Sequence, residues 1–459
     1  MSRFLSSLAR NLRSLPGNLI GDLRPRAGSA DDNIARRMRR NFIYHLHPVS
    51  VTRRALNPLT TLGLGVITVT LFFVLCVTGI LLMIYYVPTT RQAYSSMQDI
   101  EYAVTLGRFV RALHRWAAHG MVVTVLLHLV RVISMGAYRG RELNWQLGLG
   151  LCLLMLGMAF TGYLLPWDQR SFWAVSVTAS MLDGTPAIGG AVKSLLLGGE
   201  RIGQATLLRF YTLHVALLPA SMLVILALHL WRIRRDGGLA RPPSVTGEAP
   251  SVPAWPHLVL REGVIVLWVL IALAVWAALV QAPLGIPVDP HTPSNPEKAP
   301  WYFIWIQEMV SYSEVTGAFV FPGVLMTWLV ALPFVEREDE GVGRWLAGRS
   351  CRRAVAVSVL VAIGALVACE ALYIGAHSEA SPLPSAAGWP DLLNPSAAMI
   401  VLAIVVAFVS GLWTGSTRAA CLSGFFVMLV AMLGFMLVGL CRGPDWVFYL
   451  PWEEWPIGY

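Results

Sequence analysis

The sequence contains few charged residues. Asp, Glu, Lys and Arg together make up 13% of the 459 residues, whereas 56% are hydrophobic and the mean hydropathy is +0.61. Because soluble domains carry about 25% charged residues, this composition excludes a soluble globular protein. Apolar blocks of about 20 residues recur, which is the length that a helix needs to cross a bilayer. We therefore expect an all-α, polytopic protein in contact with membrane lipids.

Lysine and closely spaced cysteines are also scarce. Only Lys193 and Lys298 are lysines, so the net charge of +9 comes from arginine. The arginines gather between apolar blocks, which indicates membrane orientation rather than nucleic-acid binding. None of the six cysteines forms a CxxC or CxxCH motif, so neither a c-type haem on the usual motif nor a zinc ribbon is expected. Residues 1–40 lack the continuous apolar core of a signal peptide.

The apolar blocks predict nine membrane spans, although the last two are weakly separated and eight spans remain an alternative. Arginine-rich loops fall on one side if the N-terminus is cytoplasmic and the C-terminus lies outside. The predicted spans are residues 61–87, 111–133, 147–165, 209–233, 264–280, 316–334, 354–374, 397–414 and 419–440. The predicted organisation is an N-terminal amphipathic segment (1–58), a four-helix bundle (59–235), a Pro/Gly-rich linker (236–258) and a C-terminal domain of about five further spans (259–459).

Four histidines lie inside two of these spans. His114 and His128 are 14 residues apart in the second span, and His214 and His229 are 15 apart in the fourth. In a regular α-helix these steps turn the second ring by about 40° and 60° and move it about 21–22 Å along the axis. Each helix therefore presents one imidazole near each membrane surface. Because the two helices run parallel, His114 faces His214 and His128 faces His229.

Two imidazoles between apolar helices suit haem iron better than zinc, because zinc needs four ligands whereas haem needs two from the protein. We therefore expect two non-covalent, bis-histidine b haems. Glycines repeat the spacing of 14 on the first and third spans, at Gly65 and Gly79 and at Gly148 and Gly162; they would make room for a flat macrocycle. Four arginines near the histidines are candidate partners of haem propionates, or alternatively snorkel to the surface: Arg111, Arg115, Arg131 and Arg209.

Several stretches resemble cytochrome b of the quinol-oxidising cytochrome bc complexes. They are LHRWAAHGMVVTVLLHLVRV, ELNWQLG, TGYLLPWDQRSFWAVSV and GQATLLRFYTLHVALLPASMLVILALHLWRIRRDGG. The resemblance is strong over residues 41–238 and nearer to the chloroplast and cyanobacterial branch. It is weak in the C-terminal half, where KAPWYF (298–303) carries it.

The resemblance implies an outer quinol-oxidation site built from the loop after the third span and the loop before the sixth. The positions that correspond by motif are Pro166, Trp167, Asp168, Pro300, Trp301, Tyr302 and Phe303. The family's usual Pro-Glu-Trp-Tyr motif reads Ala-Pro-Trp-Tyr here, so the glutamate thought to accept a quinol proton is absent. We favour Glu308 as its replacement, with Glu297, Asp168 and His291 as alternatives. Gly63 stands where the chloroplast branch carries a cysteine for an extra haem, so that attachment is not expected.

The resemblance also implies bifurcated quinol oxidation, electron transfer across the membrane through the two haems and a contribution to a proton gradient. The implied partners are a Rieske iron–sulfur protein and a c-type cytochrome in a dimeric complex of the bacterial cytoplasmic membrane. Two other functions remain open. A dihaem anchor of another quinone-linked oxidoreductase would need no such loop, and a solute transporter would typically show broken helices and inverted repeats.

Overall fold

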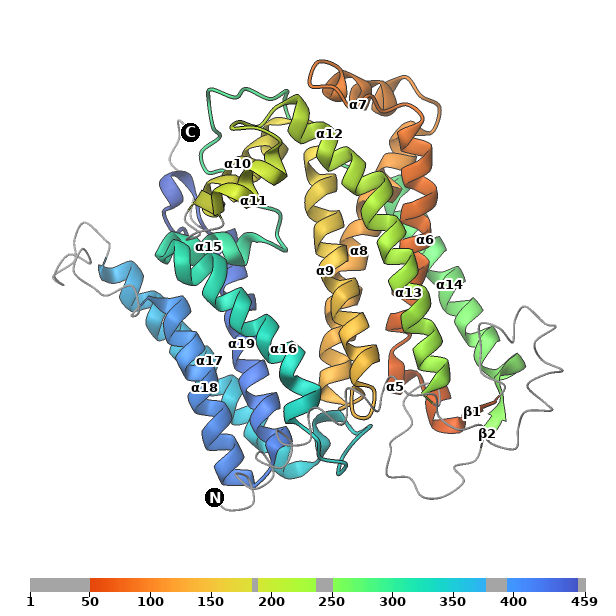
Figure 1. Ribbon diagram of the computed structural model, residues 1–459, viewed down its shortest axis with the longest axis vertical. Helices are drawn as coiled ribbons and strands as arrows, with labels where there is room; N and C mark the ends of the chain where they lie inside the picture. The colour runs from red at the N-terminus through yellow and green to blue at the C-terminus, as the bar shows by residue number, and fades with distance from the viewer. Residues whose placement is uncertain (1–49, 184–188, 237–250, 377–393, 453–459) are drawn as a thin grey trace.

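The computed structural model describes residues 50–183, 189–236, 251–376 and 394–452 (Figure 1). Within these ranges, nine helices are long and apolar enough to cross a membrane. They confirm the expected all-α polytopic fold with nine spans rather than eight. The spans are Leu64–Met83 (α6), Gly107–Ser134 (α8), Glu142–Leu164 (α9), Gln204–Arg235 (α12 to α13), Ala254–Leu279 (α14), Thr316–Val335 (η3 and α16), Arg349–Tyr373 (within α17), Pro395–Thr414 (α18) and Thr417–Leu440 (α19).

Local capping explains why the last two spans are separate. The side chain of Asn394 accepts a hydrogen bond from the Ala397 amide at the start of α18, and Ser416 accepts one from the Ala419 amide at the start of α19. Between these helices Gly415 has a φ of 70°, the left-handed conformation that glycine adopts without strain. Such caps satisfy amides that a helix leaves without partners at its first turn.

The first four spans form one bundle, in which α6 packs on α8, and α9 packs on α13 (Figure 1). The fourth span is composite: α12 (Gln204–Thr212) continues through a π-helical turn, Leu213–Leu217, into α13 (Leu218–Arg235). Buried apolar side chains fill the middle of the bundle, among them Leu71, Phe72, Ala117, Met121, Met155 and Met222.

The fifth span packs on this bundle. α14 contacts α6 and α8, so it lies apart from the group formed by α16 (Phe321–Val335), α17 (Arg349–Ala376), α18 and α19 (Figure 1). A short antiparallel pair, β1 (Ser50–Thr52) with β2 (Ser251–Pro253), holds the start of α14 beside the segment that precedes α6. The predicted boundary after residue 258 stays a prediction.

Short helices cover one end of the spans, the upper end in Figure 1, which we call the outer end; the opposite end is called the inner end. Among them, α15 packs on α19, and α10 packs on α11 and on α9. Their bounds are Ala93–Tyr102 (α7), Gln169–Asp183 (α10), Gly189–Leu197 (α11) and Ile304–Tyr312 (α15), and α5 (Pro58–Thr61) lies at the opposite end.

Polar side chains join the two groups of helices near the inner end. Trp145 Nε1 donates to the Leu329 carbonyl at 2.7 Å, and the Tyr138 hydroxyl donates to Glu336 Oε2, also at 2.7 Å. The guanidinium of Arg418, 2% exposed, pairs with the same carboxylate at 3.2 Å. A buried charge that has a partner avoids most of the cost of losing water.

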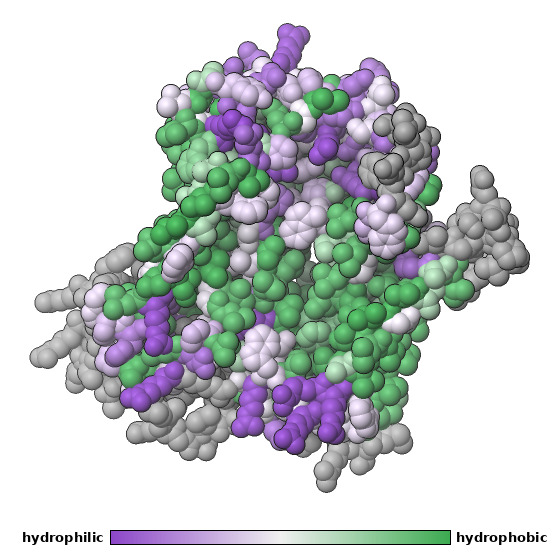
Figure 2. All heavy atoms as spheres, turned by 180° about the vertical axis from the view of Figure 1, so that it is seen from behind, coloured by the Kyte–Doolittle hydropathy of each residue, from purple (hydrophilic) through white to green (hydrophobic). Residues whose placement is uncertain are grey.

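The surface agrees with a membrane environment. Figure 2 shows hydrophobic side chains over the middle of the molecule and hydrophilic ones gathered toward its two ends. Only 6% of the most apolar stretch of the fourth span, and likewise of α14, is buried within the protein. These helices therefore face outward. The protein is an integral membrane protein whose apolar flanks meet lipid.

Candidate functional site

Two of the four membrane histidines face each other near the outer end of the bundle. The ring centroids of His114, on α8, and His214, in the π-helical turn, are 6.4 Å apart, with an angle of 69° between the rings. This separation is too large for a direct hydrogen bond. An imidazole nitrogen binds a metal at about 2 Å, so the gap accommodates one metal atom held from both sides.

The other two histidines form a second level toward the inner end. His128 lies on α8 and His229 on α13, close enough to interact electrostatically. The chain thus brings the rings together in the two pairs that the spacing predicts. Their role as haem ligands stays a prediction at this point.

Hydrogen bonds fix the orientation of three rings through Nδ1. The Nδ1 of His114 bonds with the Thr78 hydroxyl at 2.8 Å, and that of His229 bonds with the Asn144 carbonyl at 3.2 Å. The Nδ1 of His214 lies 3.1 Å from the Met158 carbonyl. Metal-binding histidines commonly use their second nitrogen in this way, because the bond orients the ring and leaves the other nitrogen for the metal.

Each of the four predicted glycines faces one histidine. A Cβ added at Gly79 or Gly148 would lie 3.4 Å from Cε1 of His114 or His229. One added at Gly162 would lie 2.4 Å from Cε1 of His214 and 3.0 Å from its Nε2. At Gly65, beside His128, the distance is 3.9 Å. Gly162 therefore makes room for the imidazole ring of His214 itself, and the room that the four glycines leave for the macrocycle stays a prediction.

The π-helical turn explains the unequal histidine spacing. A π turn accommodates one residue more than an α turn, and His214 lies within it. The step of 15 residues to His229 therefore corresponds to about 14 residues of regular helix, which matches the other histidine helix. The rotation of about 60° between the His214 and His229 side chains, which a regular α-helix would give, therefore does not apply to this helix.

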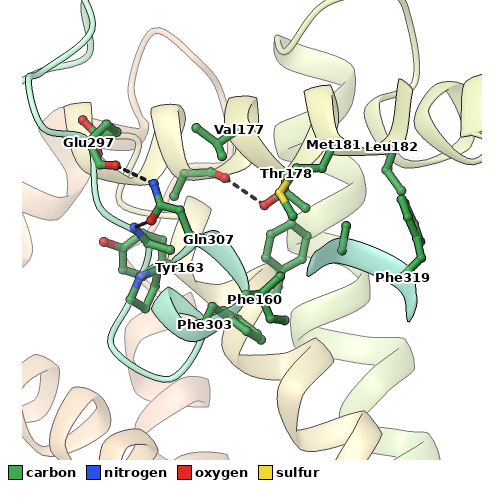
Figure 3. Close-up of a pocket in the computed structure, with 15 residues that line it drawn as sticks. Phe160, Tyr163, Val177, Thr178, Met181, Leu182, Glu297, Phe303, Gln307 and Phe319 are labelled. Atoms are coloured by element: carbon green, nitrogen blue, oxygen red, sulfur yellow. Dashed lines mark hydrogen bonds between the residues drawn. The ribbon is translucent and has the colours of Figure 1, made fainter. Parts of the chain in front are cut away.

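A cavity of about 270 Å³ lies at the outer end of α9, close in sequence to Gly162 (Figure 3). Its walls are mostly apolar and aromatic and come from α9, α10, α15, η3 and the loop before α15. The residues that line it are Phe160, Tyr163, Ala174, Val177, Thr178, Met181, Leu182, Glu297, Ala299, Pro300, Phe303, Ile306, Gln307, Ala318 and Phe319.

Comparisons with known proteins identify the bundle. The cytochrome b/b6/petB family model matches residues 54–237. Cytochrome b6 of Synechococcus elongatus is 42% identical over 175 residues, which are 38% of this chain and 81% of the relative. This chain belongs to the cytochrome b family. Cytochrome b6 of Heliobacterium mobile is 43% identical over 175 residues, 38% of this chain and 82% of the relative.

A solved structure has a similar fold over most of the chain. A chain described as "Hyperthermophilic respiratory Complex III" aligns with a TM-score of 0.64, covering 84% of this chain and 100% of that one, at 23% identity. The match extends well beyond the region that resembles cytochrome b6, so the C-terminal helices share in the similar fold.

Membership of the cytochrome b family implies b-type haem, and the residues present fit such a group. Within the described part of the chain, no group of three or more His, Cys, Asp or Glu side chains could hold a metal ion. A bare tetrahedral ion would therefore lack ligands here. Haem iron needs two axial ligands from the protein, which each histidine pair can supply.

The predicted arginines have different settings. Arg111 pairs with Glu101 at 2.6 Å and also donates to the Ala282 carbonyl. Arg209 donates to the Leu195 carbonyl at the end of α11. Arg131 donates through Nε to the Thr60 carbonyl, but its buried Nη2 has no hydrogen-bond partner among the described residues, and the same is true of Arg115 Nε. Arg115 and Arg131 are therefore the better candidates for a haem propionate.

The two predicted outer loops meet, but only some of their residues reach the cavity. Pro300 and Phe303 line it, whereas Trp301 donates from Nε1 to His119 Nδ1 at 2.9 Å and Tyr302 packs on the same imidazole. The loop after α9 is not among the lining residues. Pro166 and Trp167 precede Asp168, whose carboxylate accepts hydrogen bonds from the amides of Ser171 and Gly285 at 2.9 Å.

Glu308 lies in a setting unlike the one expected for a quinol base. Its side chain is 0% exposed and is not among the residues that line the cavity. Arg442 donates to both of its carboxylate oxygens, and the Tyr312 hydroxyl donates to Oε1 at 2.5 Å. The reason is that α15 turns Gln307 toward the cavity and the following residue toward α19.

Glu297 is the carboxyl group that lines the cavity (Figure 3). Burial raises its pKa to about 7, and its buried Oε2 has no hydrogen-bond partner among the residues that the structure describes. Gln307 holds the backbone in place: its Nε2 donates to the Glu297 carbonyl and its Oε1 accepts from the Ala299 amide, both at 2.7 Å.

Sequence reasoning did not identify the partners of the outer histidines or most of the cavity wall. Thr78 and Thr161, whose hydroxyls lie beside His114 and His214, each come directly before an outer glycine. The repeated Thr-Gly pair, spaced like the rest of the motif, could have indicated them. The cavity residues Thr178 and Gln307 carry no such signal, because helices distant in sequence bring them together.

Proposed function

We propose that this chain is the cytochrome b subunit of a quinol:cytochrome c oxidoreductase or a complex with a similar acceptor, and that it binds two b haems. The two stacked histidine pairs carry this proposal. They lie between α8 and the fourth span, and an apolar cavity lies at the end of α9 that carries Gly162, the glycine facing His214. A dihaem anchor would account for the histidines, but not for an apolar cavity that Pro300 and Phe303 of the second predicted loop help to line.

His114 and His214 would hold the outer haem, and His128 and His229 the inner one. Threonine hydroxyls and backbone carbonyls orient the rings, and Arg115 and Arg131 are available for propionates. When bound, each haem supplies a one-electron centre, and two centres about 20 Å apart along the helices would link the two membrane surfaces.

The cavity would bind the head group of a quinol. Its aromatic and aliphatic walls exclude water and fit a flat, apolar ring, while Tyr163, Thr178 and Gln307 offer polar atoms to its oxygens. We place the proton acceptor at Glu297 Oε2, because this atom is buried beside the cavity and because a carboxyl group with a pKa of about 7 exchanges its proton near neutral pH. This assignment replaces Glu308.

The remaining parts of the proposal follow from the family. The chain would oxidise quinol in a bifurcated reaction with a Rieske iron–sulfur protein and a c-type cytochrome as partners, within a dimeric complex that contributes to a proton gradient. We place it in a bacterial cytoplasmic membrane with the N-terminus cytoplasmic, because the arginine-rich loops lie at one end of the helices.

Visible absorption spectra of the full-length protein test the proposal. We expect two b-type haems per chain, and His214→Leu should remove the outer haem while the inner one persists. His257→Leu is the matched control, because His257 is exposed at the start of α14 and its loss should leave both haems. A stable wild-type protein that carries no haem would overturn the proposal.

A further inference from the structure

Two buried carboxyl groups meet behind the cavity helix α15. Glu308 of α15 is 0% exposed and Glu370 of α17 is 7% exposed. The hydroxyl of Tyr312 lies between them, 2.5 Å from Glu308 Oε1 and 2.8 and 2.9 Å from the two oxygens of Glu370. One phenol oxygen therefore contacts three carboxyl oxygens.

The hydrogen atoms available there require a protonated carboxyl group. A phenol has a single hydrogen to donate, and an ionised carboxylate only accepts. If both glutamates were ionised, one of these short contacts would bring two acceptors together without a hydrogen between them. The phenol itself stays protonated, because burial and the adjacent carboxylates raise the pKa of Tyr312 above its ordinary value. One glutamate must therefore donate to the tyrosine oxygen.

The neighbouring donors show which glutamate is ionised. Arg442 Nε lies 2.9 and 3.1 Å from the two oxygens of Glu308, and Trp446 Nε1 donates to Oε2 at 3.1 Å. A carboxylate surrounded by a guanidinium and two further donors is stabilised in its charged form. Glu370 instead faces the tyrosine hydroxyl, so the proton belongs on Glu370.

The charges of the surrounding elements lead to the same assignment. Residues of α15 contribute Glu308 and Tyr312, the segment after α19 contributes Cys441 and Arg442, and α17 itself contributes Cys369, Glu370 and Tyr373. The sequence of α18 contains no ionisable side chain. The loop before α15 adds Lys298, which interacts electrostatically with Glu308 and donates to the Leu440 carbonyl at 2.8 Å. Arg442 and Lys298 therefore both favour the ionised form of Glu308, which leaves the proton on Glu370.

We propose that Glu308, Tyr312, Glu370 and Arg442 form a proton-binding site that holds one proton on Glu370 and shares it with Glu308 through the tyrosine hydroxyl. The site is separate from the cavity, which the same helix lines through Ile306 and Gln307. It ties the cavity helix to α17 and to the segment that follows α19. Arg442 and Trp446, which both lie in the segment after α19, complete the site.

Infrared spectroscopy of the full-length protein, purified with the cofactors and partners that it retains, tests this site. We expect a protonated-carboxyl band at neutral pH that Glu370→Gln removes. Glu314→Gln should leave the band unchanged, because Glu314 is exposed two residues after Tyr312. A wild-type spectrum without the band, or a band that survives Glu370→Gln, would overturn the proposal.

Glu308→Gln provides the sharper test, because it leaves the proposed proton carrier in place. With Glu308 neutral, Arg442 has only Glu370 to balance it, so Glu370 should ionise and the band should vanish. Persistence of the band would show that Glu370 is protonated by burial alone and would refute proton sharing. Should that variant fail to fold, Tyr312→Phe tests the same bridge: the band should shift upward in frequency, and an unshifted band would contradict the hydroxyl contact.

Discussion

Alanine at Gly162 is the perturbation for which the structure gives the clearest magnitude. The added Cβ would lie 2.4 Å from Cε1 of His214, about 1 Å inside the 3.4 Å at which ordinary contact begins. The His214 ring must therefore shift away from α9 and weaken its bond to the Met158 carbonyl. Overpacking of this kind costs about 1–3 kcal/mol, so we expect partial or complete loss of the outer haem and a lower melting temperature.

Gly157, on the same helix as Gly162, supplies the control. The nearest side-chain atom to a Cβ added there is 3.7 Å away. Alanine at Gly157 should therefore leave both haems bound. The assay is haem content per chain with reduced-minus-oxidised spectra, which separate the two haems if their environments differ. A Gly162→Ala protein with both haems and an unchanged melting temperature would refute the steric argument.

Three further predictions concern the histidine partners and the cavity. Thr78→Val should remove the hydrogen bond to His114 Nδ1 and change the midpoint potential of the outer haem while the inner one stays unchanged, as redox titration would show; equal shifts in both would contradict the assignment. Glu297→Gln should slow quinol oxidation and abolish the loss of rate on acidification. The reason is that a carboxyl group with a pKa of about 7 is mostly ionised, and able to accept a proton, only above that pH. An unchanged pH–rate profile would exclude Glu297 as the acceptor. His119→Phe should keep both haems but raise the KM for quinol, because Trp301 loses the acceptor that positions its loop; an unaltered KM would show that this bond does not position the cavity.

Features that depend on periodicity could be predicted from the sequence. Hydropathy located all nine spans, and the spacing of the histidines predicted which rings meet, because a helix converts residue number directly into angle and height. The spacing of Gly65, Gly79, Gly148 and Gly162 predicted room for a macrocycle, and the structure places each of these glycines beside one of the four imidazole rings.

Features that depend on contacts between distant segments could not be predicted in this way. The sequence favoured Glu308 over Glu297 as the proton acceptor, and only the orientation of α15 shows that Glu308 is buried among donors whereas Glu297 lines the cavity. The pairing of Arg111 with Glu101 likewise depends on how α7 packs on α8. The π turn at His214 interrupts the regular helix that the spacing argument had assumed.

The contacts between the two groups of helices bear on how such a chain is assembled. At the inner end they are joined by Trp145 with Leu329 and by Tyr138 with Glu336, and α14 packs on α6 and α8. None of these interactions requires a continuous peptide between Arg235 and Ser251. The segments before and after the linker are therefore held together by non-covalent contacts of their own. A break in that linker, with both fragments made in one cell, leaves every one of these contacts available for reassembly.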